Sequence, residues 1–318
     1  MIDFRYHLVS IVAIFLALAL GIILGSTTLS QSVTAGLRRQ AQSVAQTNEQ
    51  LKRQQRQLES QLKGEDQFAE ALGPQFVAER LKGQSVVLVE TPGASNDSIE
   101  KVGELLKAAG ATVTGRVTVQ KKFLDDDQRT TVDELATQLR PSGMNFPAGA
   151  GPYDKAAAVL ASALVTRDAA KAGREDAAGG TILNGFREMG YLTTSGKPGS
   201  HATLAVVIAP SVPYATEGGD EDNKALISVA TGLDAAGRGA VVGGPATAAQ
   251  EGGLITALRD SDTEKTISST DAVDTASGQV VTVLALQNEL AGKSGQYGTG
   301  SGASGYLPTP VPAVGKNG

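Results

Sequence analysis

The sequence contains no cysteine and very few of the other residues that bind soft metal ions. Among 318 residues there are two His and three Met, and no Trp. The absence of cysteine excludes disulfide bonds, thiolate metal sites and cysteine nucleophiles. Copper ions prefer Cys, Met and His ligands, and here His7 and His201 lie far apart and the methionines are scattered. The sequence therefore predicts no metal site and no bound cofactor.

The chain also lacks an excess of positive charge and has few aromatic residues. Its formal net charge is -5, whereas proteins that bind nucleic acids need basic patches to contact phosphate. Aromatic residues make up 4% of the chain, so the core must be built from Val, Leu, Ile and Ala. We expect a globular part that faces water and no nucleic-acid partner.

Charge is absent from residues 8–24, and Ser10 is the one strongly polar side chain among them. A membrane-spanning helix needs about 20 mainly apolar residues, with roughly 17 as the lower limit. We predict a transmembrane helix over residues 8–25, after a short cytoplasmic end at 1–7. A cleaved signal peptide and a buried helix of a soluble protein are the alternatives, although residues 25–32 offer no A-x-A-like cleavage site.

The charges beside this helix give little information about its orientation. Arg5 precedes the helix, and Arg38 and Arg39 follow it at some distance. The comparison of positive charges on the two sides is close to a tie, and long domains cross membranes largely regardless of charge. A short first segment before a large domain is compatible with an N-terminus inside the cell and a C-terminal domain outside.

Residues 29–72 show a heptad repeat of a kind typical of coiled coils. One core position is taken by Leu37, Val44, Leu51, Leu58, Glu65 and Leu72, and the other by Ala41, Asn48, Gln55, Leu62 and Ala69. The simplest partner is a second copy in parallel, because both copies leave one membrane together. The predicted partner-binding seam consists of Leu37, Val44, Asn48, Leu51, Gln55, Leu58, Leu62 and Leu72.

The predicted stalk would span about 65 Å at about 1.5 Å per residue. Asn48 and Gln55 lower the stability of the seam but would fix its register and the number of partners. The alternative is an amphipathic helix that packs on its own domain. We expect Gly73 and Pro74 to end the helix, because proline lacks the N–H that a helix interior requires.

Residues 85–291 predict an α/β domain with a Rossmann-like, mainly parallel sheet. Two segments, 85–119 and 202–244, share the order strand, proline turn, helix, Ala-Ala-Gly and strand. The first helix is expected over 98–109, with Asp97 and Glu100 as a capping box, and the second over 224–235. Further helices are expected over 132–139, 155–170, 177–189 and 275–290. Residues 292–318, rich in Gly, Ser and Pro, predict a disordered tail.

No segment carries a complete catalytic motif. The glycine-bearing loops at 91–95 and 243–253 match neither the dinucleotide nor the P-loop pattern. Ser98 and Lys101 spell S-x-x-K without the elements that accompany it in acyl-transfer enzymes. The acids at 125–127 suit the first turn of a helix better than a cation site. We expect no catalytic residue and no enzyme, with a ligand at the carboxyl ends of the strands as the alternative.

Three long segments carry a resemblance to a known family. They are MIDFRYHLVSIVAIFLALALGIILG at the start, SVVLVETPG, and VDTASGQVVTVLALQNELAGKSGQYG at residues 273–298. The chain resembles the actinobacterial MctB family of copper transport outer-membrane proteins, which also includes the cell-separation protein SteB. One side of this resemblance implies copper transport through a pore. The other implies a single-pass plasma-membrane protein that, with a SteA-like membrane partner, recruits or activates a peptidoglycan hydrolase.

The resemblance supplies no catalytic or metal-binding residue that would decide between copper transport and cell separation. The two functions differ in the membrane structure that each requires. A pore needs a closed barrel or a bundle of spanning helices. The sequence offers one spanning segment, and its strands are the continuous apolar runs of a buried sheet. We therefore expect a scaffold or activator of cell-wall remodelling and cell separation in the plasma membrane, rather than the outer membrane. A component of a copper efflux pore is the alternative.

Overall fold

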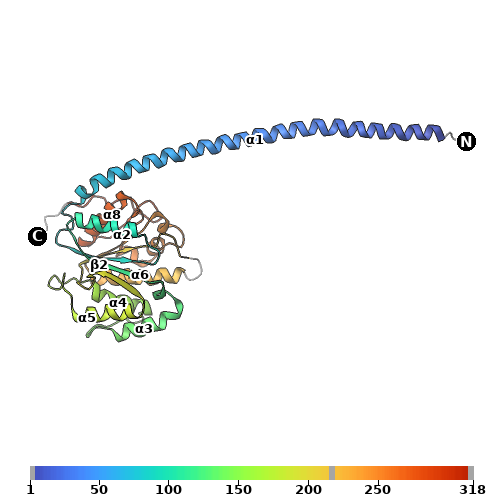
Figure 1. Ribbon diagram of the computed structural model, residues 1–318. Helices are drawn as coiled ribbons and strands as arrows, with labels where there is room; N and C mark the ends of the chain where they lie inside the picture. Colours follow the sequence, from blue (N-terminus) through green and yellow to red (C-terminus); the bar gives the residue numbers. More distant parts are fainter. Residues whose placement is uncertain (1–3, 215–218, 314–318) are drawn as a thin grey trace. The chain divides into compact units, whose positions relative to one another are not determined.

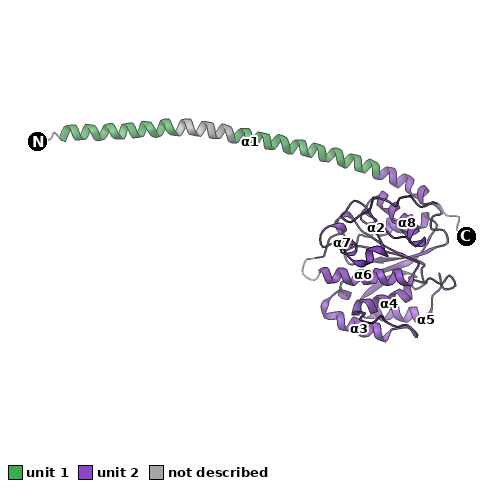
Figure 2. Ribbon diagram, turned by 180° about the vertical axis from the view of Figure 1, so that it is seen from behind, with its two compact units in different colours: residues 1–65 green, residues 66–318 purple. Residues whose placement is uncertain are grey.

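The computed structural model describes residues 4–214 and 219–313, apart from the side chains of residues 26–36. Residues 1–3 of the expected cytoplasmic end and residues 314–318 of the expected tail therefore lie outside the described residues. The chain divides into two compact units, residues 1–65 and 66–318 (Figure 2).

One helix, α1 (Phe4–Val77), contains 74 residues and includes both the expected span and the expected stalk. Its first part, Phe4–Gly25, has a mean hydropathy of 2.9 over 22 residues and no buried residue, so it fits a single membrane span. Among the described residues it is the one helix of this kind. The expectation of an apolar helix that continues into a long polar helix is confirmed, whereas the coiled coil is not, because the structure holds a single chain.

Helix α1 does not end at Gly73 and Pro74, so that prediction was wrong. The helix continues to Val77, which is fully buried, as is Leu81 in the turn that follows. A Cβ at position 73 would lie 3.0 Å from Cγ2 of Val280, so glycine allows the helix to approach α8 (Ala276–Leu290) closely. Pro74 removes one helical hydrogen bond, and the packing of the last turn on the core offsets that loss.

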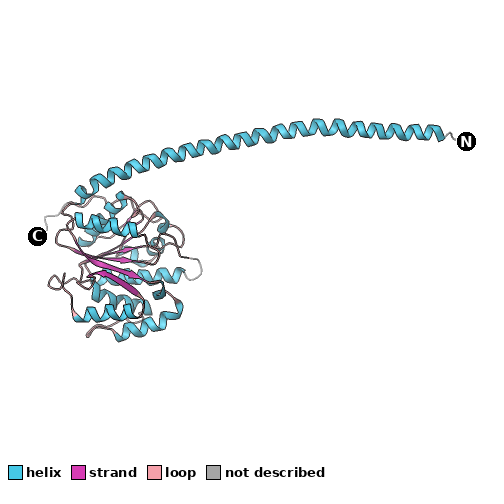
Figure 3. Cartoon of the chain, viewed as in Figure 1, coloured by secondary structure: helices cyan, strands magenta, loops and turns pink. Residues whose placement is uncertain are grey.

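The second unit contains one sheet, drawn in magenta in Figure 3. Its seven strands have the order β3-β2-β1-β4-β5-β6-β7. Six strands are parallel, and β3 at the edge is antiparallel to β2. The strands are β1 (Ser85–Glu90), β2 (Thr112–Val119), β3 (Leu192–Gly196), β4 (Leu204–Ile208), β5 (Ala240–Gly243), β6 (Ser268–Thr270) and β7 (Gln296–Tyr297). The mainly parallel α/β sheet is confirmed.

Helices connect these strands, as the repeated pattern of the sequence predicts. The α-helices after α1 are α2 (Asn96–Ala108), α3 (Arg129–Gln138), α4 (Pro152–Leu164), α5 (Ala177–Glu188), α6 (Gly219–Ala236), α7 (Leu254–Arg259) and α8 (Ala276–Leu290). Four short 3-10 helices are η1 (Lys121–Phe123), η2 (Asp126–Gln128), η3 (Ala246–Ala249) and η4 (Asp262–Lys265). The described helix α6 begins at Gly219 rather than at residue 224 as expected, so Asp220, Glu221 and Asp222 lie in its first turn.

Side chains of β1 alternate between two cores on opposite faces of the sheet. Val86 and Leu88 belong to the core beneath α2, α8 and the last turn of α1. Val87 and Val89 belong to the core shared with α3 to α7. Helices α2 and α8 therefore lie on one side of the sheet, and α3, α4, α5 and α6 lie on the other (Figure 1). Because both faces of the sheet are covered, the four residues Val86 to Val89 of β1 are all apolar, as a continuous apolar run predicts.

Several local predictions differ from the structure, and one of them is the helix expected over 155–170, because α4 ends at Leu164. Helix α2 begins at Asn96, and Oγ of Ser95 accepts the hydrogen bond from the Ser98 backbone N–H at 3.4 Å. Ser95 is therefore the N-cap, and the expected capping box of Asp97 and Glu100 was wrong. The disordered tail is not confirmed, because Gln296 and Tyr297 form β7 and pair with β6.

Candidate functional site

The predicted seam residues lie along α1 as an exposed row of apolar side chains. Leu37, Val44, Leu51 and Leu58 are 63%, 62%, 59% and 59% exposed. Leu62, at the alternate core position, is 64% exposed. All five side chains are therefore exposed on α1, and the row they form is available to another helix.

The polar seam positions and their neighbours are also exposed in α1. Nε2 of Gln55 donates a hydrogen bond of 2.8 Å to Oε1 of Glu59, and Arg53 lies 3.7 Å from Glu49. Such pairs, four residues apart, stabilise a helix by only a few tenths of a kcal/mol each. They support the helix without covering its apolar row.

Sequence reasoning missed that the exposed apolar surface of α1 continues past Leu72, the expected end of the stalk, to Phe76. In the second unit, Phe68 is 68% exposed, and Leu72 and Phe76 are 43% and 46% exposed. These three residues recur every four positions, which places them along one side of the helix. The signal was present in the sequence, but the expected helix end at Gly73 separated Phe76 from the pattern.

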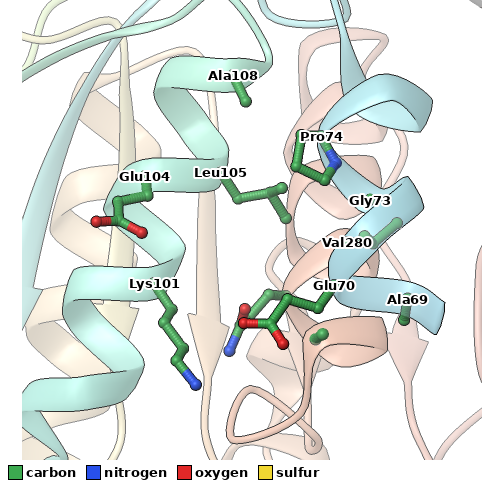
Figure 4. Close-up of a pocket in the computed structure, with 11 residues that line it drawn as sticks. Ala69, Glu70, Gly73, Pro74, Lys101, Glu104, Leu105, Ala108 and Val280 are labelled. Carbon is green, nitrogen blue, oxygen red and sulfur yellow. The ribbon is translucent and has the colours of Figure 1, made fainter. Parts of the chain in front are cut away.

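A small groove lies where the end of α1 meets α2 and α8 (Figure 4). It has a volume of about 130 Å³, the size of one large side chain. Its lining is formed by Ala69, Glu70, Gly73, Pro74, Lys101, Glu104, Leu105, Ala108, Ala276, Gln279 and Val280. In Figure 4, Lys101 and Glu104 extend from α2 and Glu70 from α1, so charged groups border an apolar floor.

Hydrogen bonds fix the last turns of α1 to α8 and to the C-terminal segment. Oδ1 of Asp66 accepts a bond of 2.6 Å from the backbone N–H of Ala276, at the amino end of α8, where negative charge is favourable. Arg80, which is 8% exposed, donates to Oε1 of Gln287 at 3.0 Å and to the carbonyl oxygen of Pro312. Burial lowers the pKa of Arg80. The base of α1 is therefore an integral part of the second unit.

The carboxyl ends of β1 and β4, where a sheet of this order can bind a ligand, are joined by side-chain hydrogen bonds. The hydroxyl of Tyr214 donates to the carbonyl oxygen of Pro92 at 2.9 Å, and Oγ1 of Thr91 donates to that of Ile208 at 2.8 Å. Burial raises the pKa of Tyr214. A neutral phenol that donates to a backbone carbonyl holds the two loops together, so these hydroxyls have structural partners.

The other chemical candidates also have local partners. The Ser98 backbone N–H is capped by Ser95, and Nζ of Lys101 lies 3.4 Å from Oδ2 of Asp97, one helical turn earlier. Asp126 pairs with Arg129 at 3.7 Å. In the part of the chain that the structure describes, no group of three or more His, Cys, Asp or Glu side chains is arranged to hold a metal ion.

Comparison with known proteins identifies the family. The model of the family described as "Copper transport outer membrane protein, MctB" matches residues 1–308. The chain belongs to the MctB family. A protein of Mycobacterium tuberculosis named "Copper transporter MctB" is 29% identical over 308 residues, which cover 95% of this chain and 98% of the relative. A protein of the same name from Mycobacterium leprae is 29% identical over 313 residues, covering 96% and 98% of the two chains. The family expected from the sequence is confirmed.

Proposed function

We propose that this MctB-family chain is a single-pass membrane scaffold that forms a parallel homodimer through α1. The observation that supports the proposal is the row of apolar side chains at seven-residue intervals, each about 60% exposed, from Leu37 to Leu58. Coiled-coil partners bury such a row by inserting each side chain between four residues of the facing helix. A second copy supplies the same row in the same register.

The energetics favour pairing within a membrane. Fully burying one exposed Leu or Val side chain stabilises an interface by about 1.5–3 kcal/mol. A dimer buries ten apolar seam side chains, five from each helix, and each is about 60% exposed before pairing, so together they contribute on the order of 10–20 kcal/mol. Association in solution costs about 4–15 kcal/mol in lost translational and rotational freedom. Anchoring both copies in one membrane raises their effective concentration and reduces that cost.

The proposed setting is the plasma membrane, with the N-terminus in the cytoplasm and the α/β domain outside. In this setting the exposed surface of α1 recruits a SteA-like membrane partner, and the pair recruits or activates a cell-wall hydrolase during cell separation. The α/β domain contributes as a binding module rather than as an enzyme. The resemblance to a family that includes the cell-separation protein SteB supports these partners.

Copper transport is the second candidate function, and the names of the mycobacterial relatives favour it. The two candidates differ in a measurable way. A transport component produces copper flux when the purified full-length chain is reconstituted into liposomes. A scaffold that acts through its stalk produces none under the same conditions.

We expect the double substitution Leu51→Asp and Leu58→Asp to abolish self-association. Two carboxylates in each helix would have to enter the apolar seam, where unpaired charge is strongly unfavourable. The measurement is analytical ultracentrifugation of the full-length chain in detergent micelles, combined with capture of partners after crosslinking in cells. The matched control is Gln57→Asp with Ser60→Asp, which adds the same charge to the same turns on the opposite side of α1.

The control protein is expected to remain dimeric and to capture the same partners as the natural chain. If the seam variant also remained dimeric and kept its partners, the proposed scaffold would be wrong.

A further inference from the structure

A cavity of about 540 Å³ opens at the amino ends of β5 and β6, on the edge of the sheet opposite to the loops of Pro92 and Tyr214. It is lined by Arg167, Asp234, Arg238, Lys265, Thr266, Glu289, Leu290, Gly292 and Ser294. Three of these nine residues are basic, although the whole chain carries a net charge of -5. With the two acidic residues Asp234 and Glu289 both ionised, the lining has a formal charge of +1, whereas the whole chain is negative.

Two of the basic residues are free to meet a ligand. The third, Arg167, already has a structural partner. Its Nε donates to the carbonyl oxygen of Gly237 at 2.5 Å, just after the end of α6, so this guanidinium caps the carboxyl end of the helix. Within the described residues, the side chain of Arg238 makes one hydrogen bond, from Nη1 to Oε1 of Gln84 at 3.2 Å, and its other N–H groups remain available. Within the described ranges, no carboxylate lies within ion-pair distance of Arg238 or Lys265.

The two acidic residues of the cavity, Glu289 and Asp234, repel an anion less than two fully ionised carboxylates would, because the pKa of each is raised. Glu289 is 7% exposed, and its Oε1 accepts hydrogen bonds from the backbone N–H and the Oγ of Ser268. Burial, and then the nearby carboxylate of Asp234, raise the pKa of Glu289 to about 7. Burial also raises the pKa of Asp234, whose Oδ1 accepts from the backbone N–H of Ala240. A protonated Glu289 is neutral and has an O–H to donate.

We propose that this cavity binds a small ligand that carries an oxyanion group, held by Arg238 and Lys265 at the rim and by Glu289 at the floor. The guanidinium and the ammonium provide charge-assisted hydrogen bonds to oxygen. The buried carboxyl of Glu289 completes the set when it is protonated. The site uses residues of α8 and of the loops before β5 and β6, and it is separate from the stalk.

Binding is tested with inorganic sulfate, a tetrahedral oxyanion whose charge is constant between pH 6 and 8, and with acetate as the planar counterpart. Equilibrium dialysis of radiolabelled sulfate or acetate against the full-length chain in detergent micelles is run at constant ionic strength in chloride. We expect saturable binding of at least one of the two probes. Arg238→Gln with Lys265→Gln should weaken that binding about tenfold or more, since each loses a charged hydrogen bond.

Both substituted side chains are exposed, so the variant is expected to melt at the temperature of the natural chain. Lys197→Gln, at an exposed position outside the cavity, is the matched control and should bind like the natural chain. The proposal is overturned if the natural chain binds neither probe saturably, or if the double variant binds as tightly as the control.

The pH dependence gives a second readout. The charged groups around Glu289 are Asp234 on α6, Arg167, Arg238 and Lys265 at the rim, and the phenol of Tyr297 on β7. If the bound anion requires a neutral Glu289, the affinity for sulfate should fall about tenfold from pH 6 to pH 8, in proportion to the protonated fraction. Glu289→Gln should bind sulfate with the same affinity at both pH values. If the affinity of Glu289→Gln for sulfate fell from pH 6 to pH 8 as much as that of the natural chain, this result would contradict the role of the Glu289 carboxyl.

Discussion

Replacing Arg259 with methionine is expected to lower the free energy of unfolding by about 3–5 kcal/mol. Arg259, at the end of α7, and Asp271, just after β6, form an ion pair of 2.8 Å with side chains 2% and 0% exposed. Methionine removes the cation and leaves a carboxylate in a site that water does not reach. An unpaired buried charge is among the most destabilising changes that a single substitution can produce.

The pair also organises the C-terminal segment. The guanidinium donates to the carbonyl oxygens of Tyr297 and Ser301 at 2.9 Å each. The carboxylate accepts from the backbone N–H groups of Thr299 and Gly300 at 2.8 and 2.9 Å. Loss of the arginine therefore exposes the segment after β7 as well as weakening the core. We expect faster proteolytic cleavage between residues 297 and 306 in the variant.

Urea unfolding of the full-length chain in micelles, followed by tyrosine fluorescence, measures the loss. Arg129→Met is the matched control, because the side chain of Arg129 is 39% exposed in its pairs with Asp126 and Glu221. Exposed pairs contribute little, so this control should lose less than about 1 kcal/mol. If the free energy of unfolding fell equally in the two variants, the buried Arg259–Asp271 pair would contribute no more to stability than an exposed pair, and the prediction would be wrong.

Glu289→Gln is expected to raise the free energy of unfolding at pH 8 by about 3 kcal/mol relative to the natural chain, and to leave it similar at pH 4. The pKa of Glu289 is raised from 4.5 to about 7 in the folded chain, chiefly by burial. The folded chain therefore holds this proton more tightly than the unfolded chain does. Its contribution is fully present below about pH 4.5, declines by about 1.4 kcal/mol per pH unit as pH rises, and is lost above about pH 7. Glutamine keeps an oxygen to accept from Ser268 and has no charge to bury.

The prediction is checked by comparing the free energy of unfolding of the two proteins at pH 4 and pH 8. They should be similar at pH 4, and the Gln variant should be the more stable one at pH 8. Glu188→Gln, at an exposed position of α5, should follow the natural chain at both pH values. A difference between the natural chain and Glu289→Gln that does not vary with pH would contradict the assignment.

The apolar strands could be predicted because their side chains carry the signal themselves. Val86 to Val89 form a continuous apolar run, and each successive residue enters one of the two cores. The row of Leu37, Val44, Leu51 and Leu58 was similarly readable from its spacing, and the structure leaves it exposed as a partner-binding surface requires. An element can be predicted from the sequence when the residues that determine it all lie in one segment.

The polar strands could not be predicted because their stability depends on distant partners. Ser268, Ser269 and Thr270 form β6 and are fully buried or nearly so, although their sequence is typical of a loop. Their hydroxyls bond to Glu289, Gln296 and Thr282, which belong to α8 and β7. Only tertiary packing brings these groups together. The same reasoning accounts for the helical turn after Pro74, whose support comes from α8.

Cysteine crosslinking along α1 tests the central claim, that α1 pairs with a second copy through its apolar row. Because the chain has no Cys, each substitution introduces the only thiol. Single-cysteine chains at Leu51, Leu58 and Leu62 in the seam, and at Gln57 and Ser60 on the opposite side, are oxidised mildly in intact membranes. A disulfide requires Cα atoms about 4.4–6.8 Å apart, so we expect covalent dimers from the three seam positions and none from the other two. Equal crosslinking on both sides of the helix, or none at the seam, would contradict the account.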